Sequence, residues 1–152
     1  MNRILPVITL YQPWATWIMR EWKTIETRTH NRFQCLKGQT ILIHAGQKTD
    51  YSEVATKNNY LTWEQICYKP EELVNGFILG HVHVSGFKKL DVSHSKSALI
   101  DCEHTERWGL FLEKIHCFDV PIPVQGEMGI WYFDHELMQK VKKPKQQLPS
   151  LF

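Results

Sequence analysis

The chain has 152 residues, of which 43% are hydrophobic and 22% charged, and its formal net charge is +2. A chain of this length buries roughly two-thirds of its unfolded surface, enough for one domain with its own core. No stretch reaches the roughly 20 apolar residues of a membrane span, and the N-terminus lacks the features of a signal peptide. These properties argue against a membrane protein and predict a monomeric cytoplasmic protein, with a nuclear location as the alternative.

The charges are unevenly distributed along the chain. Residues 1–48 hold seven Lys or Arg and two acids, residues 49–139 hold seven and fourteen, and residues 140–152 hold four lysines and no acid. The basic first third is a weak indication of a phosphate-bearing ligand, because charge segregated in sequence need not be segregated in space. The four cysteines form no C-x-x-C pair, so we expect reduced thiols and neither a zinc site nor a redox motif.

The predicted elements begin with a strand over 5–10, where LPVITL is apolar and β-branched. A short helix over 13–21 follows, because Pro13 suits a first helical turn and the tryptophans after it repeat at helical spacing. Beyond that helix the pattern changes to period two, which predicts a strand that carries Glu26 and Arg28 on one face.

Further strands are predicted at 39–45, 77–85, 108–118 and 128–133, and short helices at 50–58, at 62–68 with Thr62 as its N-cap, at 93–100 and at 134–142. This pattern predicts an α+β domain over residues 1–139, a small closed or half-closed β-barrel of five to six strands with short peripheral helices. The proline-broken basic segment at 140–152 is predicted to be a flexible tail.

Glu26 and Arg28 are the first candidates for chemistry. At two residues apart on a strand, the guanidinium can reach the carboxylate, and removing either member of a buried pair would cost about 3–5 kcal/mol. Lys23 has the opposite parity and is expected in the turn before the strand, where its ammonium can act as a base, a nucleophile or an anion anchor. Spacing alone favours the simpler interpretation, a structural ion pair beside an exposed lysine.

Trp14 follows the turn-forming Tyr11-Gln12-Pro13, a place where a ring can line a pocket and stack on a base, whereas Trp17 is expected in the core. His81 and His83 share one strand face, but nothing nearby supplies a third or fourth metal ligand. Neither a phosphate loop nor a nucleophile elbow is present. We therefore expect no metal and no other cofactor.

Six segments, in this order, resemble the ASCH family: YQPW (11–14), WKTIETR (22–28), ILIHA (41–45), GFILGHV (76–82), WGLFL (108–112) and PVQGEMGIW (123–131). The family signature G-x-K-x-x-E-x-R is matched at Lys23, Glu26 and Arg28, while Glu21 replaces the leading glycine. That replacement falls at the end of the predicted helix, where glycine makes an easy left-handed cap. The resemblance covers about residues 5–133.

The resemblance implies a β-barrel similar to the PUA RNA-binding domain, with a cleft beside the barrel where the signature lies. It also implies binding of RNA or another nucleic acid, and some family members look like hydrolases. One related branch deacylates N4-acetylcytidine with a lysine, a threonine three positions later and a glutamate from elsewhere. Lys23 matches that lysine, but Glu26 stands in the place of the threonine, so the mechanism does not carry over intact.

We predict a ligand cleft formed by Gln12, Pro13, Trp14, Lys23, Thr24, Glu26, Arg28, His44 and Trp131. The favoured hypothesis is a domain that binds RNA or single-stranded nucleic acid and takes up a modified or flipped base, with Trp14 and Trp131 as stacking surfaces. The alternative is a small hydrolase acting on RNA or nucleosides, a ribonuclease or an enzyme similar to an N4-acylcytidine amidohydrolase, with Lys23 and Glu26 as catalytic groups. A third interpretation, a protein-interaction module, has no feature of the sequence in its favour.

Overall fold

The structure is a computed structural model that describes residues 2–49, 60–61, 65 and 73–145. Its elements, in chain order, are β1 (Ile4–Gln12), α1 (Trp14–Met19), β2 (Ile25–Arg28), the 3-10 helix η1 (Gln34–Leu36), β3 (Thr40–Thr49), β4 (Phe77–Lys89), the 3-10 helix η3 (Val92–His94), α4 (Ser95–Ala98), β5 (Trp108–Pro123), β6 (Ile130–Asp134) and β7 (Gln139–Val141). Most of the described elements are strands and the helices are short, as the residue patterns along the sequence predict.

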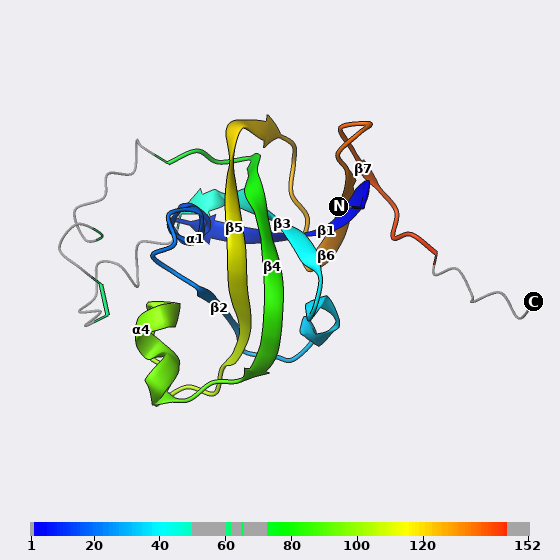
Figure 1. The fold of residues 1–152 in the computed structure, drawn as a ribbon. Helices are drawn as coiled ribbons and strands as arrows, with labels where there is room; N and C mark the ends of the chain where they lie inside the picture. Colours follow the sequence, from blue (N-terminus) through cyan, green and yellow to red (C-terminus); the bar gives the residue numbers. More distant parts are fainter. Residues whose placement is uncertain (1, 50–59, 62–64, 66–72, 146–152) are drawn as a thin grey trace, which may run out of the picture.

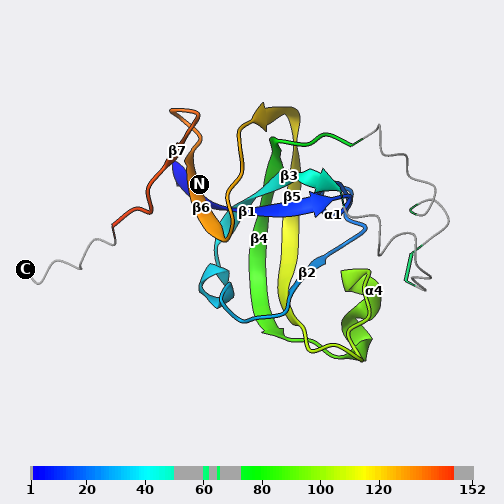
Figure 2. The ribbon, with the colours of Figure 1, turned by 180° about the vertical axis from the view of Figure 1, so that it is seen from behind.

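The strands form one seven-stranded sheet in the order β2-β5-β4-β3-β1-β6-β7. β1 and β3 are parallel, and every other neighbouring pair is antiparallel. Figure 1 shows β1 running across the long pair β4 and β5, and Figure 2 shows the same crossing from behind. The pairing of β4 with β5 shifts register at three points. Such bulges bend the strands and increase their local twist, which is consistent with this crossing.

The sheet does not close on itself. Among the described residues, β2 pairs only with β5 and β7 only with β6, so these two strands are the edges of an open sheet. The closed or half-closed barrel expected from the sequence is therefore not confirmed. The observed fold is a bent, mostly antiparallel sheet with short helices at its periphery.

Alternating side chains of the strands build apolar clusters on both faces of the sheet. On β3, Ile41 and Ile43 join the larger cluster with α1, while Leu42 between them joins the smaller cluster around Trp131 and Phe133. This is the period-two pattern of a strand that is buried on both sides. Trp17 of α1 is fully buried, as predicted for a core residue.

Most predicted elements are confirmed within a few residues. The strands expected at 5–10, 39–45, 77–85, 108–118 and 128–133 appear as β1, β3, β4, β5 and β6, the helices expected at 13–21 and 93–100 appear as the shorter α1 and α4, and the strand carrying Glu26 and Arg28 appears as β2. The helix expected at 50–58 and nearly all of the one at 62–68, Thr62 included, lie outside the described residues. No helix in the described part of the chain is both long and apolar enough to cross a membrane.

The helix predicted over 134–142 is wrong. The side chain of Asp134 accepts hydrogen bonds from the backbone N–H groups of Glu136 and Leu137, which forms a turn, and β7 then pairs back onto β6. Glu, Leu, Met, Gln and Lys are strong helix formers, so local propensity favoured a helix, and pairing with β6 overrides it. β7 also includes residues 140 and 141, which the sequence assigned to the tail.

Candidate functional site

The turn that ends α1 brings Lys23 to the start of β2. The backbone N–H groups of Trp22 and Lys23 both donate to the Trp17 carbonyl, at 2.9 and 3.2 Å. Glu21, which stands where the ASCH signature has glycine, has a φ of 61°, in the left-handed region that glycine adopts most readily. The departure from the signature therefore keeps the left-handed turn and leaves the polar residues after it in place.

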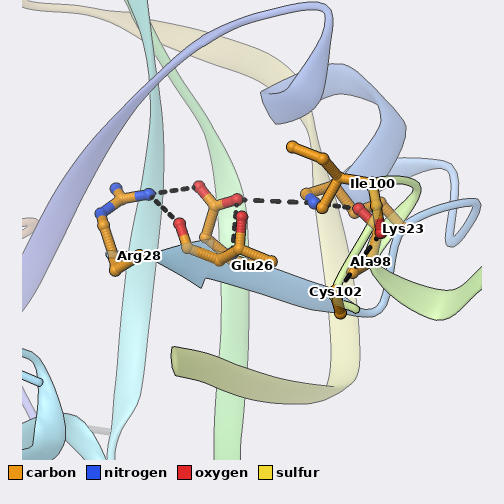
Figure 3. Close-up of polar contacts among 7 residues, drawn as sticks. Lys23, Glu26, Arg28, Ala98, Ile100 and Cys102 are labelled. Carbon is orange, nitrogen blue, oxygen red and sulfur yellow. Dashed lines mark hydrogen bonds and ion pairs between the residues drawn. The ribbon is translucent and has the colours of Figure 1, made fainter. Parts of the chain in front are cut away.

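The three signature residues form a row of alternating charge, drawn in Figure 3. Lys23 Nζ donates to the Ala98 carbonyl of α4 and lies 3.6 Å from Glu26 Oε1. Glu26 Oε2 accepts from Arg28 Nη1 at 2.8 Å, and its Oε1 accepts from the backbone N–H of Thr27 at 3.1 Å. Lys23 is 2% exposed and Glu26 5% exposed, so the ion pair is buried and the lysine is not the exposed residue that its spacing alone suggested.

Burial and neighbouring charges change the pKa of both buried groups. Burial lowers the pKa of Lys23 from its usual 10.5, and the nearby Arg28 adds to this effect while Glu26 opposes it. Burial acts to raise the pKa of Glu26, but Arg28 and Lys23 outweigh it and hold that pKa below its usual 4.5. Glu26 is therefore a carboxylate near neutral pH, and Lys23 loses its proton more readily than a lysine in water.

A cleft of about 490 Å³ lies against this row of charges. Its walls are formed by Thr9, Leu10, Tyr11, Trp14, Lys23, Glu26, Thr27, Arg28, His30, Arg32, Phe33, Ile100, Arg107, Glu127, Met128 and Gly129. The volume is in the range of sites for small molecules. Four Lys or Arg side chains face two carboxylates, so the lining carries a surplus of positive charge that suits an anionic ligand.

Aromatic rings hold the cations on the cleft wall. Lys23 Nζ lies 5.1 Å from the centre of the Trp14 ring, which contacts Trp17 edge-on at 5.3 Å. The guanidinium carbon of Arg28 lies 5.0 Å from the centre of the Phe33 ring. At these distances a cation is attracted to the ring face, so Trp14 and Phe33 fix where the positive charges sit.

Gln12, Pro13 and Thr24, predicted as ligand contacts, lie outside the cleft lining. Gln12 is fully buried, where it accepts from the Thr16 backbone N–H at 3.0 Å and donates to the Val74 carbonyl at 2.8 Å. The Pro13 carbonyl accepts the first helical hydrogen bond of α1, and the backbone of Thr24 bonds to α4 and β5. These residues shape the segment that carries Trp14 and Lys23.

His44 and Trp131, also predicted as ligand contacts, lie behind the cleft. The Trp131 indole N–H donates to Thr9 Oγ1 at 3.0 Å, Thr9 Oγ1 lies 3.3 Å from His44 Nδ1, and His44 Nε2 lies 2.7 Å from the Val124 carbonyl. Trp131 is 3% exposed and His44 1%. The chain of hydrogen bonds links β6, β1 and β3 to the end of β5.

The loop of residues 125–129 lies on top of this chain. A Cβ at Gly126 would lie 2.6 Å from His44 Cε1 and 2.7 Å from Thr9 Oγ1, so only glycine allows the loop to come this close. The next two residues, Glu127 and Met128, line the cleft, and Met128 is 98% exposed. His44 and Thr9 thus position a loop that forms one wall of the cleft.

Three residues that line the cleft were not predicted from the sequence: Arg32, Phe33 and Arg107. Arg32 and Phe33 follow Arg28 closely and belong to the basic first third of the chain, so the charge pattern was a signal for them. Arg107 reaches the cleft from the loop before β5, where its Nε donates to the Asp101 carbonyl at 3.0 Å. Nothing local in the sequence points to Arg107, because the fold brings that loop beside β2.

One group of potential metal ligands occurs in the described part of the chain, formed by Asp101, Glu103 and His104. His104 Nδ1 lies 2.8 Å from an Asp101 carboxylate oxygen, so these two groups already bond to each other on an exposed loop. His81 faces His116 of β5, with ring centres 4.9 Å apart. Neither arrangement by itself indicates a bound metal.

No protein-family model and no curated protein matches the sequence. Among solved structures, the ASCH protein from Zymomonas mobilis superposes with a TM-score of 0.56 and is 15% identical, covering 93% of this chain and 99% of its own. The fold is ASCH-like. Two point mutants of ASCH from the same organism are 18% and 17% identical at a TM-score of 0.49, covering 81% and 80% of this chain and 76% of their own.

The fold places residues 22–28 at the cleft. Residues 22–28 form the end of the α1 turn and β2, and all three matching side chains of this segment line the cleft. Residues 123–131, another of the matching segments, supply the loop whose Glu127, Met128 and Gly129 also line the cleft. Two segments that are about a hundred residues apart in the sequence therefore meet at one site.

Proposed function

We propose that the protein binds RNA or another single-stranded nucleic acid, and that the cleft takes up one flipped or modified base together with its phosphate. The observation that carries this proposal is that one cleft combines the half-buried aromatic ring of Trp14 with the guanidinium groups of Arg28, Arg32 and Arg107. Single-strand binding sites combine these two features, because rings stack on bases and cations follow the backbone.

The cleft residues divide the task by their chemistry. The guanidinium groups of Arg32 and Arg107 can bind phosphate through two parallel hydrogen bonds, whereas an ammonium acts as a point charge. A base stacked on Trp14 would gain about 1–3 kcal/mol. Both carboxylate oxygens of Glu26 already accept hydrogen bonds, so we assign Glu26 to holding Lys23 and Arg28 in place.

The test is binding of a labelled single-stranded oligonucleotide as a function of salt concentration. Each phosphate that a cation of the protein neutralises makes the plot of log K against log salt steeper by about 0.7 for a single strand. We expect Arg107→Gln and Arg32→Gln each to weaken binding and to reduce the slope by about this amount. Lys37→Gln is the control, because it removes the same charge from the basic first third at a residue outside the cleft lining. Absence of binding by the wild type at low salt would refute the proposal.

A hydrolase is the second candidate, and the observation in its favour is the buried Lys23–Glu26 pair on the cleft wall. A lysine with a lowered pKa is a better base or nucleophile near neutral pH. The test incubates the protein with RNAs and N4-acylated cytidines, with and without Mg²⁺, and looks for product. If the wild type turns a substrate over and both Lys23→Ala and Glu26→Gln retain full turnover, these residues are not the catalysts.

The monomeric state and the cytoplasmic location remain predictions from the sequence. A nucleic acid or a nucleoside is the only partner we propose here.

A further inference from the structure

A second hollow, of about 570 Å³, lies beside the cleft. It is lined by Cys35, Glu127, Ile130, Trp131, Tyr132, Lys140, Val141, Lys142 and Lys143. The lysines come from β7 and the residues directly after it, a basic segment that the proposed base site does not use. Figure 2 shows β6 and β7 at the end of the sheet away from α4.

The two hollows meet at the loop of residues 125–129. Glu127, in the loop of residues 125–129, lines both of them, and its Oε1 lies 3.4 Å from Lys140 Nζ of β7. Met128 stands almost fully exposed beside it and faces the first cleft. A ligand that leaves the cleft over this loop therefore meets the lysines of the second hollow.

The second hollow is positively charged over an apolar floor. Three lysines face one carboxylate, and Lys142 and Lys143 are exposed. Ile130 and the half-buried Tyr132 supply the apolar surface between them. Flexible lysines bind phosphates as point charges and make no demand on geometry, which suits a sugar–phosphate backbone better than the recognition of one base.

We infer that the second hollow binds the backbone of the same strand whose base occupies the first cleft, so that the protein covers several consecutive nucleotides. This inference rests on the proposed function, because it extends the path of that ligand. The shared residue Glu127 carries the argument, since it makes the two hollows neighbours along one path. An acidic protein segment would meet the same lysines, but it would have no reason to continue into an aromatic cleft.

The length of the ligand separates the two sites in an experiment. Affinities are measured for a uridine dinucleotide and for an oligouridylate of about ten nucleotides, a length within the range of small single-strand binding domains. The test variant replaces Lys140, Lys142 and Lys143 by Gln. The matched control replaces Lys88, Lys89 and Lys96 by Gln, which removes the same charge outside both hollows.

For the long strand, we expect the test variant to lower the affinity about tenfold or more and to reduce the salt slope by about 2, as loss of three phosphate contacts implies. The dinucleotide should bind with an unchanged affinity, because it fills only the first cleft. In the control triple variant, the ratio of the affinities for the long strand and the dinucleotide should be the same as in the wild type. The double variant Lys142→Gln with Lys143→Gln leaves β7 unchanged. It should also weaken binding of the long strand and not of the dinucleotide, by a smaller factor than the triple variant.

The other outcomes overturn the inference. An equal loss for both ligands would indicate a general charge effect, and no loss for the long strand would show that the lysines do not contact it. Selective binding of an oligoglutamate by these lysines, with no effect on RNA, would assign the hollow to an acidic protein partner. If neither nucleotide ligand binds the wild type, the proposed function fails as well. If the lysine variant shows no selective loss for the long strand while Arg107→Gln still weakens binding of the dinucleotide, only the inference fails.

Discussion

Glu26 connects two cations at the bottom of the cleft. One of its oxygens lies 3.6 Å from the ammonium of Lys23, and the other accepts from Arg28 at 2.8 Å. The carboxylate is therefore the group that makes it possible to keep Lys23 away from water. Any function of the cleft that uses the positive charge of Lys23 or Arg28 depends on Glu26 first.

Glu26→Gln should destabilise the fold by about 3 kcal/mol, because it leaves Lys23 buried without its counter-charge. The free energy of unfolding in urea measures the effect. The double variant Lys23→Met with Glu26→Leu should lose less than the single variant, because it removes the charge together with its partner. Equal stability of Glu26→Gln and the wild type would mean that Lys23 is already neutral in the folded protein.

The sequence identified Lys23, Glu26 and Arg28 as neighbours, but it did not predict that Lys23 and Glu26 are buried. Parity placed Lys23 in the turn before β2 and placed Glu26 with Arg28 on one face, and their side chains do form an ion pair. The cover comes from α4, whose Ala98 carbonyl binds Lys23 across 75 residues of sequence. Spacing near residue 23 contains no information about such a contact, so local reasoning favoured an exposed lysine.

The loop between β5 and β6 shows how an element can matter more than the residues predicted within it. His44 and Trp131 were predicted to touch the ligand, and they instead lie under the loop that carries Glu127 and Met128. Both residues belong to segments that line or support the cleft, but an aromatic or imidazole ring in such a segment does not reveal which side of the loop it faces. Close approach at Gly126 is the feature that decides this.

Gly126→Ala should displace this loop and weaken nucleic-acid binding about tenfold while the sheet stays folded, because the new Cβ would lie under 3 Å from His44 and Thr9. Oligonucleotide affinity and thermal unfolding are measured together. Gly86→Ala is the control, since its Cβ would meet Phe111 at an ordinary 3.8 Å. Unchanged affinity of Gly126→Ala would show that the loop does not contribute to the site.

Gln12 has a comparable role at the start of α1. Its side chain binds the Thr16 backbone N–H, the Thr16 hydroxyl and the Val74 carbonyl. We expect Gln12→Leu to cost about 1–3 kcal/mol of stability, because buried backbone groups lose their partners. Gln12→Glu should cost at least as much, because a buried carboxylate oxygen would replace the amide N–H group that donates to the Val74 carbonyl. Urea unfolding of the two variants provides the measurement, and a Gln12→Leu variant as stable as the wild type would contradict the assignment.

For the whole molecule, the sequence predicted the number and order of most strands but not how the sheet ends. Five strands were located because their apolar runs are long and bounded by turn residues. β7 was missed because HELMQKV contains mostly strong helix formers and its strand state depends on pairing with β6. A closed or half-closed barrel was expected from the pattern of strands and from the family resemblance, whereas closure depends on contacts between edge strands that no local pattern encodes.

The chain of hydrogen bonds through His44 connects β6, β1 and β3 with Val124, the residue after β5, and makes the stability of the whole fold depend on pH. The Val124 carbonyl can only accept, so His44 Nε2 donates to it, and Nδ1 accepts from the Thr9 hydroxyl, which itself accepts from Trp131. This network requires a neutral imidazole. Burial lowers the pKa of His44 below its usual 6.5, against the opposing effect of the bond to Val124.

Below pH 6.5 the unfolded chain therefore takes up a proton at residue 44 that the folded protein does not, so acid favours unfolding. The free energy of unfolding should fall with decreasing pH by up to about 1.4 kcal/mol per unit from this group, until the pKa of the folded state is reached. In His44→Gln this contribution should disappear, while His81→Gln, which removes a histidine with its own lowered pKa outside the network, should leave it in place. Urea unfolding of the three proteins between about pH 7 and pH 5 tests this, because the wild type and His44→Gln would show the same slope if His44 were not a group that titrates.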